Sequence, residues 1–228
     1  MNDKQLVARQ AATLVQDGML VGLGTGSTAN FFIEELARRQ AEERLRVSVV
    51  SSSTVSAIKA QALGLPLVAM EHISRLDLYV DGADEVTPDL TLLKGRGYDL
   101  VREKLLAKAA DRFVVLIDPS KRVERIGERF PIPVEVRPLA WQLVKHRLEN
   151  LGGQGGLRPN AAGDGLAITS HGSLVLDMLF GTEWDSWALD ETLNATPGVV
   201  EHGIFRALAS SVLVALDGEV KELIADGN

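Results

Sequence analysis

The sequence predicts an α/β fold: a mostly parallel sheet flanked by helices, followed by a small α+β subdomain. Two observations predict it. Short apolar runs alternate with amphipathic helical stretches through the first half of the chain, which is the pattern of parallel strands joined by crossover helices. After Asp118 the residue pattern changes, and a proline-rich segment begins a second unit. Two late apolar runs joined by Asp217-Gly218 predict a hairpin that returns to the first sheet or its edge.

Each element of the first half follows from local spacing. Apolar residues recur at helical spacing over residues 3–17, and Asp17-Gly18 ends that pattern before a buried run at 19–23. Further strands are expected near 47–50, 65–69, 76–81 and 113–117, and further helices over 27–39, 53–63 and 99–110. The alternation indicates one parallel sheet.

The second unit begins at Phe130–Val136, whose prolines a central strand would not tolerate. Beyond it we expect helices over 139–151 and 187–193, a glycine-rich surface loop over 152–165, and strands at 166–169 and 173–178. The hairpin strands are 212–216 and 220–224. The domain prediction is therefore one domain formed by residues 1–127 and 204–228, and a second formed by residues 128–203.

The composition excludes several classes of function. The 228 residues carry 31 acidic and 24 basic side chains, a net charge of -7, with no long run of either sign, so the footprint of a nucleic-acid-binding protein is missing. The absence of cysteine excludes disulfides, thiolate catalysis and Cys-ligated metal. No segment reaches the roughly 18 apolar residues of a membrane span, and the N-terminus lacks a signal-peptide core. We expect a cytoplasmic protein that binds neither nucleic acid nor membrane.

The first candidate site is Gly22–Thr28, a glycine-rich turn between a buried strand and a helix. Glycines let the backbone approach an anion, and helix-start amides with the hydroxyls of Ser27 and Thr28 can donate to it. The alternative is a plain tight turn with Ser27 as the helix cap. The spacing also fits a loose dinucleotide fingerprint, but the second strand ends in Ser51-Ser52-Ser53 without the acidic residue that would hold a ribose. NAD is therefore disfavoured, and the serines suit sugar hydroxyls or phosphate.

The second candidate site is Asp81-Gly82-Ala83-Asp84-Glu85, which closes the strand at 76–81. Carboxylates at the carboxyl end of a strand lie where open α/β sheets bind ligands, so they suit acid-base work or hydroxyl binding. The alternative is an acidic loop that caps local amides. A Mg²⁺ site is not supported, because no third carboxylate or histidine pattern accompanies the pair.

The third candidate site is Lys94-Gly95-Arg96-Gly97 with the helix that follows it. On a helical wheel Glu103 falls on the apolar side, away from Arg102 and Lys104. Burial raises the pKa of a carboxylate and makes it a better base near neutral pH. The alternative is an ordinary surface glutamate in a charged helix.

These motifs, in this order, resemble those of the type A ribose-5-phosphate isomerases. Matching segments at Asp118–Lys121, Phe130–Val136 and Pro197–Phe205 extend the resemblance over nearly the whole chain. The resemblance implies a Rossmann-like domain with a small α+β lid subdomain. It also implies a homodimer or larger homo-oligomer, with a homodimer expected here, that uses no metal and no organic cofactor.

The resemblance implies a site as well. Substrate binding falls on Lys4, Thr25, Gly26, Ser27, Thr28, Gly82, Ala83, Gly95, Arg96, Gly97 and Lys121. The catalytic residues are Glu103 as base, with Lys94, Asp81 and Asp84. The reaction implied is the interconversion of D-ribose 5-phosphate and D-ribulose 5-phosphate through a cis-enediolate, in the non-oxidative pentose phosphate branch. Alternatives are a non-catalytic sugar-phosphate sensor and an isomerase of another aldose phosphate.

Two segments depart from the family pattern. The usual Lys-Gly-Gly-Gly carries Arg96, and Tyr98 and Asp99 follow where smaller residues are common. If position 96 needs a positive φ, arginine costs about 1 kcal/mol there. The second departure is Thr169–Ser173, with His171 at its centre, where the family commonly has Thr-Asp-Asn-Gly-Asn. These departures leave the substrate preference open.

Overall fold

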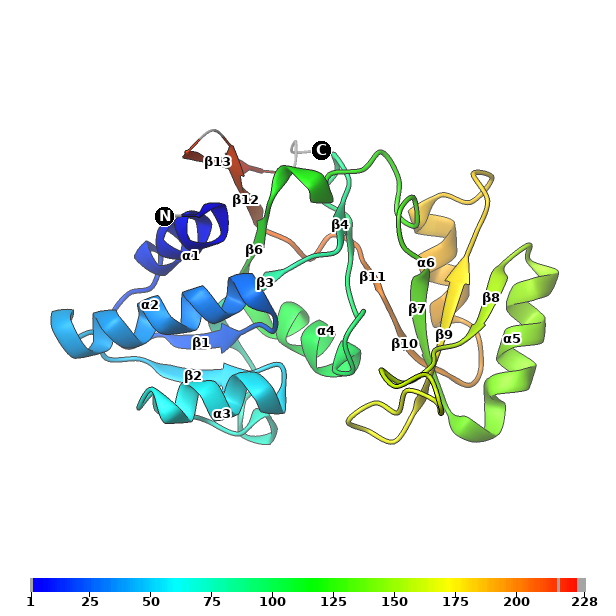
Figure 1. The fold of residues 1–228 in the computed structure, drawn as a ribbon, viewed down its shortest axis with the longest axis horizontal. Helices are drawn as coiled ribbons and strands as arrows, with labels where there is room; N and C mark the ends of the chain where they lie inside the picture. Colours follow the sequence, from blue (N-terminus) through cyan, green and yellow to red (C-terminus); the bar gives the residue numbers. More distant parts are fainter. Residues whose placement is uncertain (1, 217, 225–228) are drawn as a thin grey trace. The chain divides into compact units, whose positions relative to one another are not determined.

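The structure is a computed structural model that describes residues 2–216 and 218–224. The chain divides into two compact units (Figure 1): one runs to Ala83 and includes Arg102–Lys121 and the residues from Ala207, and the other comprises Asp84–Val101 and Arg122–Arg206. Residues 84–101, expected in the first domain, group with the second unit. The reason is a three-stranded sheet in which β5 (Leu92–Leu93) pairs with β4 (Glu85–Val86) on one side and with β11 (Ile204–Phe205) on the other.

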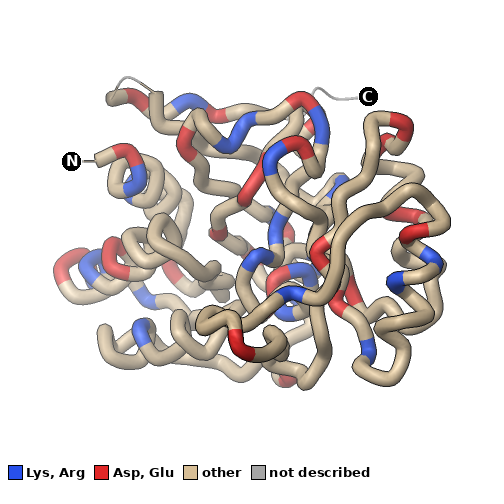
Figure 2. Tube along the Cα trace, turned by 45° about the vertical axis from the view of Figure 1, so that its right-hand side comes forward, with Lys and Arg blue, Asp and Glu red and all other residues tan. Residues whose placement is uncertain are grey.

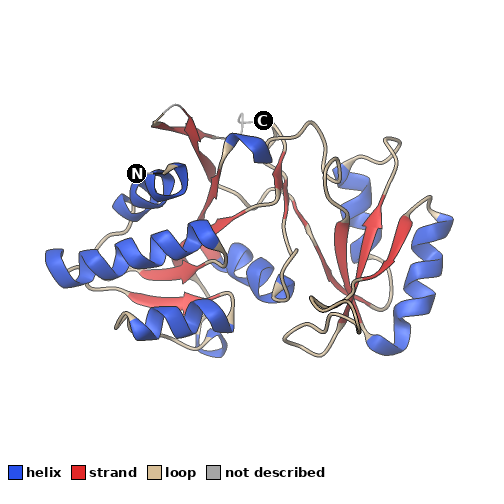
Figure 3. Ribbon diagram, in the orientation of Figure 1, coloured by secondary structure: helices blue, strands red, loops and turns tan. Residues whose placement is uncertain are grey.

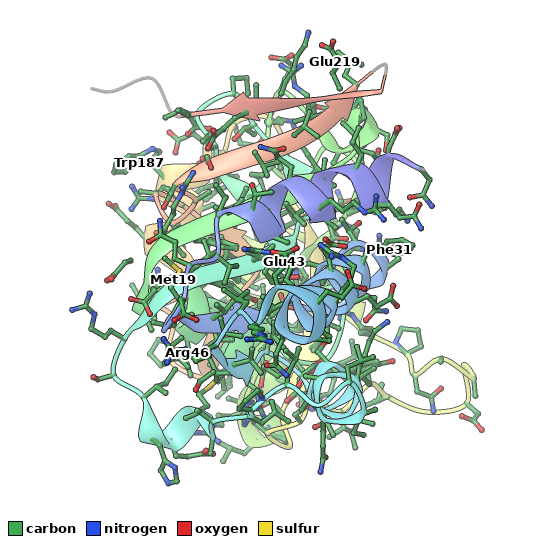
Figure 4. All side chains as sticks on the ribbon, turned by 90° about the vertical axis from the view of Figure 1, so that its left-hand side faces the viewer. Met19, Phe31, Glu43, Arg46, Trp187 and Glu219 are labelled. Atoms are coloured by element: carbon green, nitrogen blue, oxygen red, sulfur yellow. The ribbon has the colours of Figure 1, made fainter. Side chains whose placement is uncertain are left out.

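A six-stranded sheet forms the centre of the first unit, in the order β13-β12-β6-β3-β1-β2. Its strands are β1 (Leu20–Leu23), β2 (Ser48–Ser51), β3 (Leu76–Gly82), β6 (Ala110–Ile117), β12 (Ser211–Leu216) and β13 (Glu219–Leu223). Neighbours pair in parallel except β12 with β13. Figure 4 shows the strands one below another, with Glu219 on the edge strand. The predicted mostly parallel sheet is confirmed.

Helices cover both faces of this sheet. They are α1 (Asp3–Thr13), α2 (Ser27–Glu43), α3 (Thr54–Ala62) and α4 (Leu100–Ala109), with short 3₁₀ turns η1 (Met70–His72) and η2 (Pro119–Lys121). The β1-α2-β2 connection runs one way along the sheet, and α4 leads from β3 to β6 the other way. Right-handed crossovers therefore place α2 and α4 on opposite faces (Figure 1). Phe32, Ile33 and Leu36 of α2 are fully buried in the resulting core.

The helix α2 runs past the predicted end at residue 39. Ion pairs between residues four apart, Arg38 with Glu42 at 2.6 Å and Arg39 with Glu43 at 2.9 Å, stabilise the extra turn. Arg44 then ends the helix in the left-handed conformation, with a φ of 59°. Apolar periodicity could not show this extension, because charged residues make it.

The second unit is a small α+β structure, as predicted (Figure 3). Its four-stranded antiparallel sheet has the order β10-β7-β9-β8. The elements are β7 (Ile132–Val136), η3 (Pro138–Ala140), α5 (Trp141–Asn150), β8 (Gln154–Leu157), β9 (Leu174–Leu179), α6 (Ser186–Asn194) and β10 (Val199–His202). Val134 of β7, Val144 and Leu148 of α5, and Leu193 of α6 share one buried core.

The prediction that prolines keep residues 130–136 out of a central strand is wrong. The strand β7 pairs with both β9 and β10. Pro133 is tolerated because its carbonyl accepts a hydrogen bond from Gly203 N, beyond the last β10 pair of Val134 with His202. The nitrogen of a strand residue faces the same side as its carbonyl, so the missing N–H faces the end of the β10 ladder rather than β9.

Two further strand predictions and one loop prediction need correction. Residues 65–69 form an isolated bridge from Leu67 to Val49 rather than a strand. Residues 166–169 likewise make isolated bridges only. The glycine-rich stretch contains β8, because a Cβ at Gly155 would lie 1.9 Å from Asp177 O and only glycine allows this approach to β9. The predicted hairpin is confirmed by the β12–β13 pairing, while its turn residue Asp217 lies outside the described residues.

The distribution of charged and apolar residues in the structure agrees with what the composition indicates. Basic and acidic residues are interspersed along the traces of both units (Figure 2). Among residues 2–216 and 218–224, no helix has the length and apolarity that crossing a membrane requires.

Candidate active site

The predicted residues of the first unit gather at the carboxyl edge of its parallel strands. Gly24–Thr28 follow β1, Ser51–Ser53 end β2, and Asp81 and Gly82 end β3. Lys121 ends the turn η2 that follows β6, the neighbour of β3. This is the edge at which open α/β sheets bind their ligands.

Gly24–Thr28, the anion loop, starts the helix α2. The N-cap is Gly26, with a φ of 110° and no side-chain cap, so the alternative in which Ser27 caps the helix is wrong. The first amides of α2 are therefore left to a ligand or to water. Lys4 of α1 adds a cation, because its Nζ donates to Ser27 Oγ at 2.8 Å. Amides, a hydroxyl and a lysine at one helix start form a chemically suitable site for a phosphate.

Asp81 fastens this loop to β3. Its carboxylate is 1% exposed, and Oδ1 accepts hydrogen bonds from Thr25 N at 3.0 Å and Gly82 N at 2.8 Å. A Cβ at Gly24 would lie 2.1 Å from Oδ1, so this glycine is needed for the approach. Asp81 therefore caps local backbone amides, which was the alternative interpretation of this motif.

The serines at the end of β2 hold the side chain of Thr25. Thr25 Oγ1 donates to Ser53 Oγ at 2.7 Å and lies 2.9 Å from Ser52 Oγ. Ser53 also caps α3 by accepting from Ser56 N at 3.2 Å, which confirms its capping role. These serines are buried and bind the anion loop itself.

Glu103 lies on the helix α4 and belongs to the first unit, as the anion loop does. Glu103 is 7% exposed, so the expectation that it turns away from solvent is confirmed. Its neighbour Arg102 donates from Nη2 to Ser51 O at 3.2 Å and ties the first turn of α4 to the end of β2. Lys104, expected on the polar side, is buried as well, and Leu105 is exposed instead. More of the surface of α4 is therefore buried than its apolar residues alone indicate.

Tyr79 is a residue that the sequence reasoning missed. Its hydroxyl donates to Asp81 Oδ2 at 2.6 Å, and its ring stacks on Phe113 with centroids 4.7 Å apart. Burial, and then the negative charges of Asp81 and Glu103, raise the pKa of the phenol well above its ordinary value. In the sequence Tyr79 looks like one more apolar strand residue. The available indication was the spacing of two, which puts Tyr79 and Asp81 on one face of β3.

The remaining predicted residues, Asp84 and Lys94–Gly97, belong to the second unit. Lys94 is buried, its backbone N donates to Gly203 O at 2.9 Å, and its Nζ lies 5.7 Å from the centroid of the Phe205 ring. Gly95 has a φ of 86°, and a Cβ there would lie 2.5 Å from Leu100 Cδ1. Glycine is therefore required beside the lysine.

Arg158, also missed from the sequence, holds the loop that follows Lys94. Its Nη1 donates to the carbonyls of Gly95, Arg96 and Gly97 at 3.2, 3.1 and 2.8 Å. The other side of its guanidinium makes two hydrogen bonds with Asp177, at 2.8 and 2.6 Å. The planar fork of arginine suits this double role.

Arg96 is accommodated without backbone strain. Arg96 is not among the described residues that have a positive φ, so the expected backbone cost of about 1 kcal/mol is absent. Its guanidinium lies 3.8 Å from the centroid of the Phe130 ring, and its Nη1 lies 3.8 Å from Asp84 Oδ1. A cation thus stands beside a predicted catalytic aspartate.

The two segments that depart from the family pattern lie against each other. Ser170 N donates to Tyr98 O at 3.2 Å, and Ser170 Oγ donates to Asp99 Oδ1. His171, next along the chain, is exposed. The two segments therefore form one continuous surface of the second unit.

Glu85, which closes the second motif, is structural. It is fully buried, and its carboxylate accepts hydrogen bonds from Gly127 N at 2.7 Å, Arg129 N at 2.7 Å and Phe130 N at 2.9 Å. Within the described residues, no group of three or more His, Cys, Asp or Glu side chains is arranged to hold a metal ion.

The sequence matches a known family over most of its length. The sequence model described as ribose 5-phosphate isomerase A (phosphoriboisomerase A) matches residues 48–219. The chain belongs to this family. It is accordingly an aldose-ketose isomerase.

Relatives and solved structures of the family match nearly the whole chain. The ribose-5-phosphate isomerase A of Roseiflexus sp. (strain RS-1) is 45% identical over 97% of this chain and 95% of its own length. That of Methanothermobacter thermautotrophicus is 44% identical over 98% of each. The structure of ribose 5-phosphate isomerase A from Methanocaldococcus jannaschii superposes with a TM-score of 0.92, at 41% identity and 97% coverage of both chains.

One solved relative carries a ligand. It is a D-ribose-5-phosphate isomerase in complex with phospho-erythronic acid, with a TM-score of 0.93, 35% identity, and coverage of 98% of this chain and 100% of that one. These structural matches show that the fold predicted from the sequence is the fold of this family.

Proposed function

We propose that this chain interconverts D-ribose 5-phosphate and D-ribulose 5-phosphate through a cis-enediolate, with Glu103 as the base. One observation carries the proposal: the first unit holds an uncapped helix start with Lys4 and the buried carboxylate of Glu103 at the same edge of its sheet. The names of the relatives support the substrate, and phospho-erythronic acid bound to one of them is itself a sugar-acid phosphate.

The anion loop takes the phosphate of the substrate in this proposal. Amides at the start of α2, the hydroxyls of Ser27 and Thr28, and the cation of Lys4 supply donors and charge. The phosphate does not react, so its binding energy serves to fix C1 and C2 of the sugar against the base.

Glu103 moves the proton. Its carboxylate takes the proton from C2 of the open-chain aldose, and the electron pair of that C–H bond forms the C1–C2 double bond while the carbonyl oxygen at C1 becomes an oxyanion. A proton passes from the hydroxyl at C2 to the oxygen at C1. Glu103 then returns its proton to C1, and the carbonyl forms at C2. Burial of the carboxylate makes it a stronger base for the first transfer.

Two of the other predicted catalytic residues, Lys94 and Asp84, act on the oxygens. Lys94, buried in the second unit, supplies positive charge for the enediolate oxygen. Asp84 is 24% exposed and can exchange protons with the sugar hydroxyls during ring opening. Gly82, Ala83, Gly95, Gly97 and Lys121 remain predicted substrate contacts.

Three expectations from the resemblance belong to this proposal: a homodimer, a cytoplasmic location, and a place in the non-oxidative pentose phosphate branch. Sedimentation of the purified protein measures the first. The expected result is one species of twice the chain mass of 24.6 kDa.

Removal of metal tests the proposal directly. After EDTA treatment the protein is expected to convert ribose 5-phosphate to ribulose 5-phosphate at its untreated rate, because a carboxylate and a lysine carry the chemistry. Absence of turnover before treatment would overturn the proposed reaction. Loss of turnover on treatment, restored by Mg²⁺ or Zn²⁺, would overturn its metal independence.

Arg96 is expected to tune substrate preference. In Arg96→Gly the cation beside Asp84 and the contact with Phe130 are lost, so KM for ribose 5-phosphate should rise about three- to tenfold with a smaller change in kcat. The ratio of kcat/KM between ribose 5-phosphate and other aldose phosphates should shift as well. Arg96→Lys, which keeps the charge but not the planar stack, should fall between. Unchanged values across substrates would make Arg96 a neutral replacement.

A further inference from the structure

Two of the three glycines of the first motif, Gly22 and Gly24, face a pair of side chains on the neighbouring strand. In the parallel register Gly22 of β1 lies opposite Tyr79 of β3. A Cβ at Gly22 would lie 2.7 Å from Tyr79 Cδ2, and one at Gly24 would lie 2.1 Å from Asp81 Oδ1. The glycines therefore make room for a phenol and a carboxylate, in addition to any approach to an anion.

That pair is joined by a buried hydrogen bond. Tyr79 OH donates to Asp81 Oδ2 at 2.6 Å, while Oδ1 of the same carboxylate accepts from Thr25 N in the anion loop at 3.0 Å. Both side chains are almost fully buried. Stacking on Phe113 fixes the direction of the phenol, so the hydroxyl holds one carboxylate oxygen and thereby aims the other at the loop.

The loop has a second anchor, on the side chain of Thr25. Ser52 Oγ lies 2.9 Å from Thr25 Oγ1. Thr25 is thus held by its backbone through Asp81 and by its side chain through Ser52. Tyr79 supports the first of these two contacts, and Thr25, Ser52, Tyr79 and Asp81 all lie in the first unit.

We propose that Tyr79 is a positioning residue for the anion loop, acting through the carboxylate of Asp81. In this arrangement Asp81 serves the reaction by fixing the loop that binds the phosphate, and work on the sugar hydroxyls falls to Asp84. The assignment rests on the proposed function for the identity of the substrate, but not for the binding of phosphate itself.

Removing the hydroxyl alone is expected to loosen the loop. Without the phenol hydroxyl, Asp81 Oδ2 loses this buried hydrogen bond, and the carboxylate is free to turn. The turn weakens the bond from Thr25 N and costs the organisation of the amides at the start of α2. The loss appears in binding of the phosphate group, in the ground state and the transition state alike, and hence in KM rather than kcat.

The test is Tyr79→Phe, which keeps the ring and its stack. We expect KM for ribose 5-phosphate and the Kd of inorganic phosphate, measured by calorimetry, to rise together by about tenfold, with kcat within about threefold of the parent. Amide hydrogen exchange over residues 24–28 should accelerate. Tyr98→Phe, the same change at the other tyrosine of the chain, should leave the Kd of phosphate unchanged.

Other results overturn the proposal. An unchanged Kd of phosphate shows that Tyr79 does not position the loop. A fall in kcat with KM and Kd unchanged places Tyr79 at the reacting atoms near Glu103 instead. Should Tyr79→Phe not fold, Asp81→Asn, which keeps the shape of the side chain, must show the same joint rise in KM and Kd. If the parent binds phosphate but does not convert ribose 5-phosphate, the proposed function fails while the Kd comparison still decides the role of Tyr79.

Discussion

Replacing Glu103 with glutamine is expected to lower kcat for ribose 5-phosphate by about 10³-fold or more, while the chain stays folded. The amide has the size of the carboxylate, but it cannot accept the proton from C2. The anion loop is formed by other residues of the first unit, so inorganic phosphate should bind to the variant with the parental Kd. Steady-state kinetics and calorimetry measure the two quantities on one preparation.

A matched control separates the loss of a base from the loss of a charge. Glu149 on α5 forms an exposed ion pair with Lys145 in the second unit, and Glu149→Gln should keep the parental kcat. A Glu103→Gln variant that retains more than about a tenth of the parental kcat would remove Glu103 from the role of base.

Replacing Glu85 with glutamine is expected to lower the free energy of unfolding by about 3 kcal/mol. The carboxylate is fully buried and accepts from the backbone amides of Gly127, Arg129 and Phe130. A glutamine offers one oxygen to these donors and turns its own NH₂ group toward at least one of them. Urea unfolding followed by circular dichroism measures the loss.

The control for this prediction is a second buried glutamate, Glu135. Burial raises the pKa of this carboxyl above its ordinary value, and Thr169 Oγ1 donates to it at 2.8 Å. The ionised form is therefore disfavoured in the fold, and the contribution of Glu135 to stability falls as the pH rises toward its folded pKa. An uncharged amide replaces it at smaller loss, so Glu135→Gln should cost under about 1 kcal/mol. Equal losses in the two variants would contradict the structural role given to Glu85.

The parts of the fold that the sequence predicts are those set by long apolar patterns. The parallel sheet and its helices have periodicity over many residues, and the hairpin has a clear turn. The strands β4 and β5 are two residues long each and carry no period. They form by pairing with each other, and β5 also pairs with the distant β11. Pairing with β9 likewise forms β8 in the glycine-rich stretch, and pairing on both sides gives β7 a central place despite Pro133.

The site divides in the same way. The anion loop and Glu103 have local patterns, a glycine-rich strand-to-helix turn and a helical face, and both could be predicted. Tyr79, Glu85 and Arg158 act through partners distant in sequence or through a neighbouring strand residue, on buried faces. A buried tyrosine in an apolar run looks like core, and an arginine in a loop looks like surface. Only the folded arrangement shows what they hold.

Turnover of ribose 5-phosphate by the EDTA-treated protein in D₂O tests the proton transfer by Glu103 most directly. A carboxylate that holds the proton between C2 and C1 exchanges it with solvent for part of its lifetime. Early in the reaction, NMR should therefore show ribulose 5-phosphate with deuterium at C1, and Glu103→Gln should form almost none. Absence of ribulose 5-phosphate, product free of deuterium, or undiminished turnover by Glu103→Gln would each contradict the proposed mechanism.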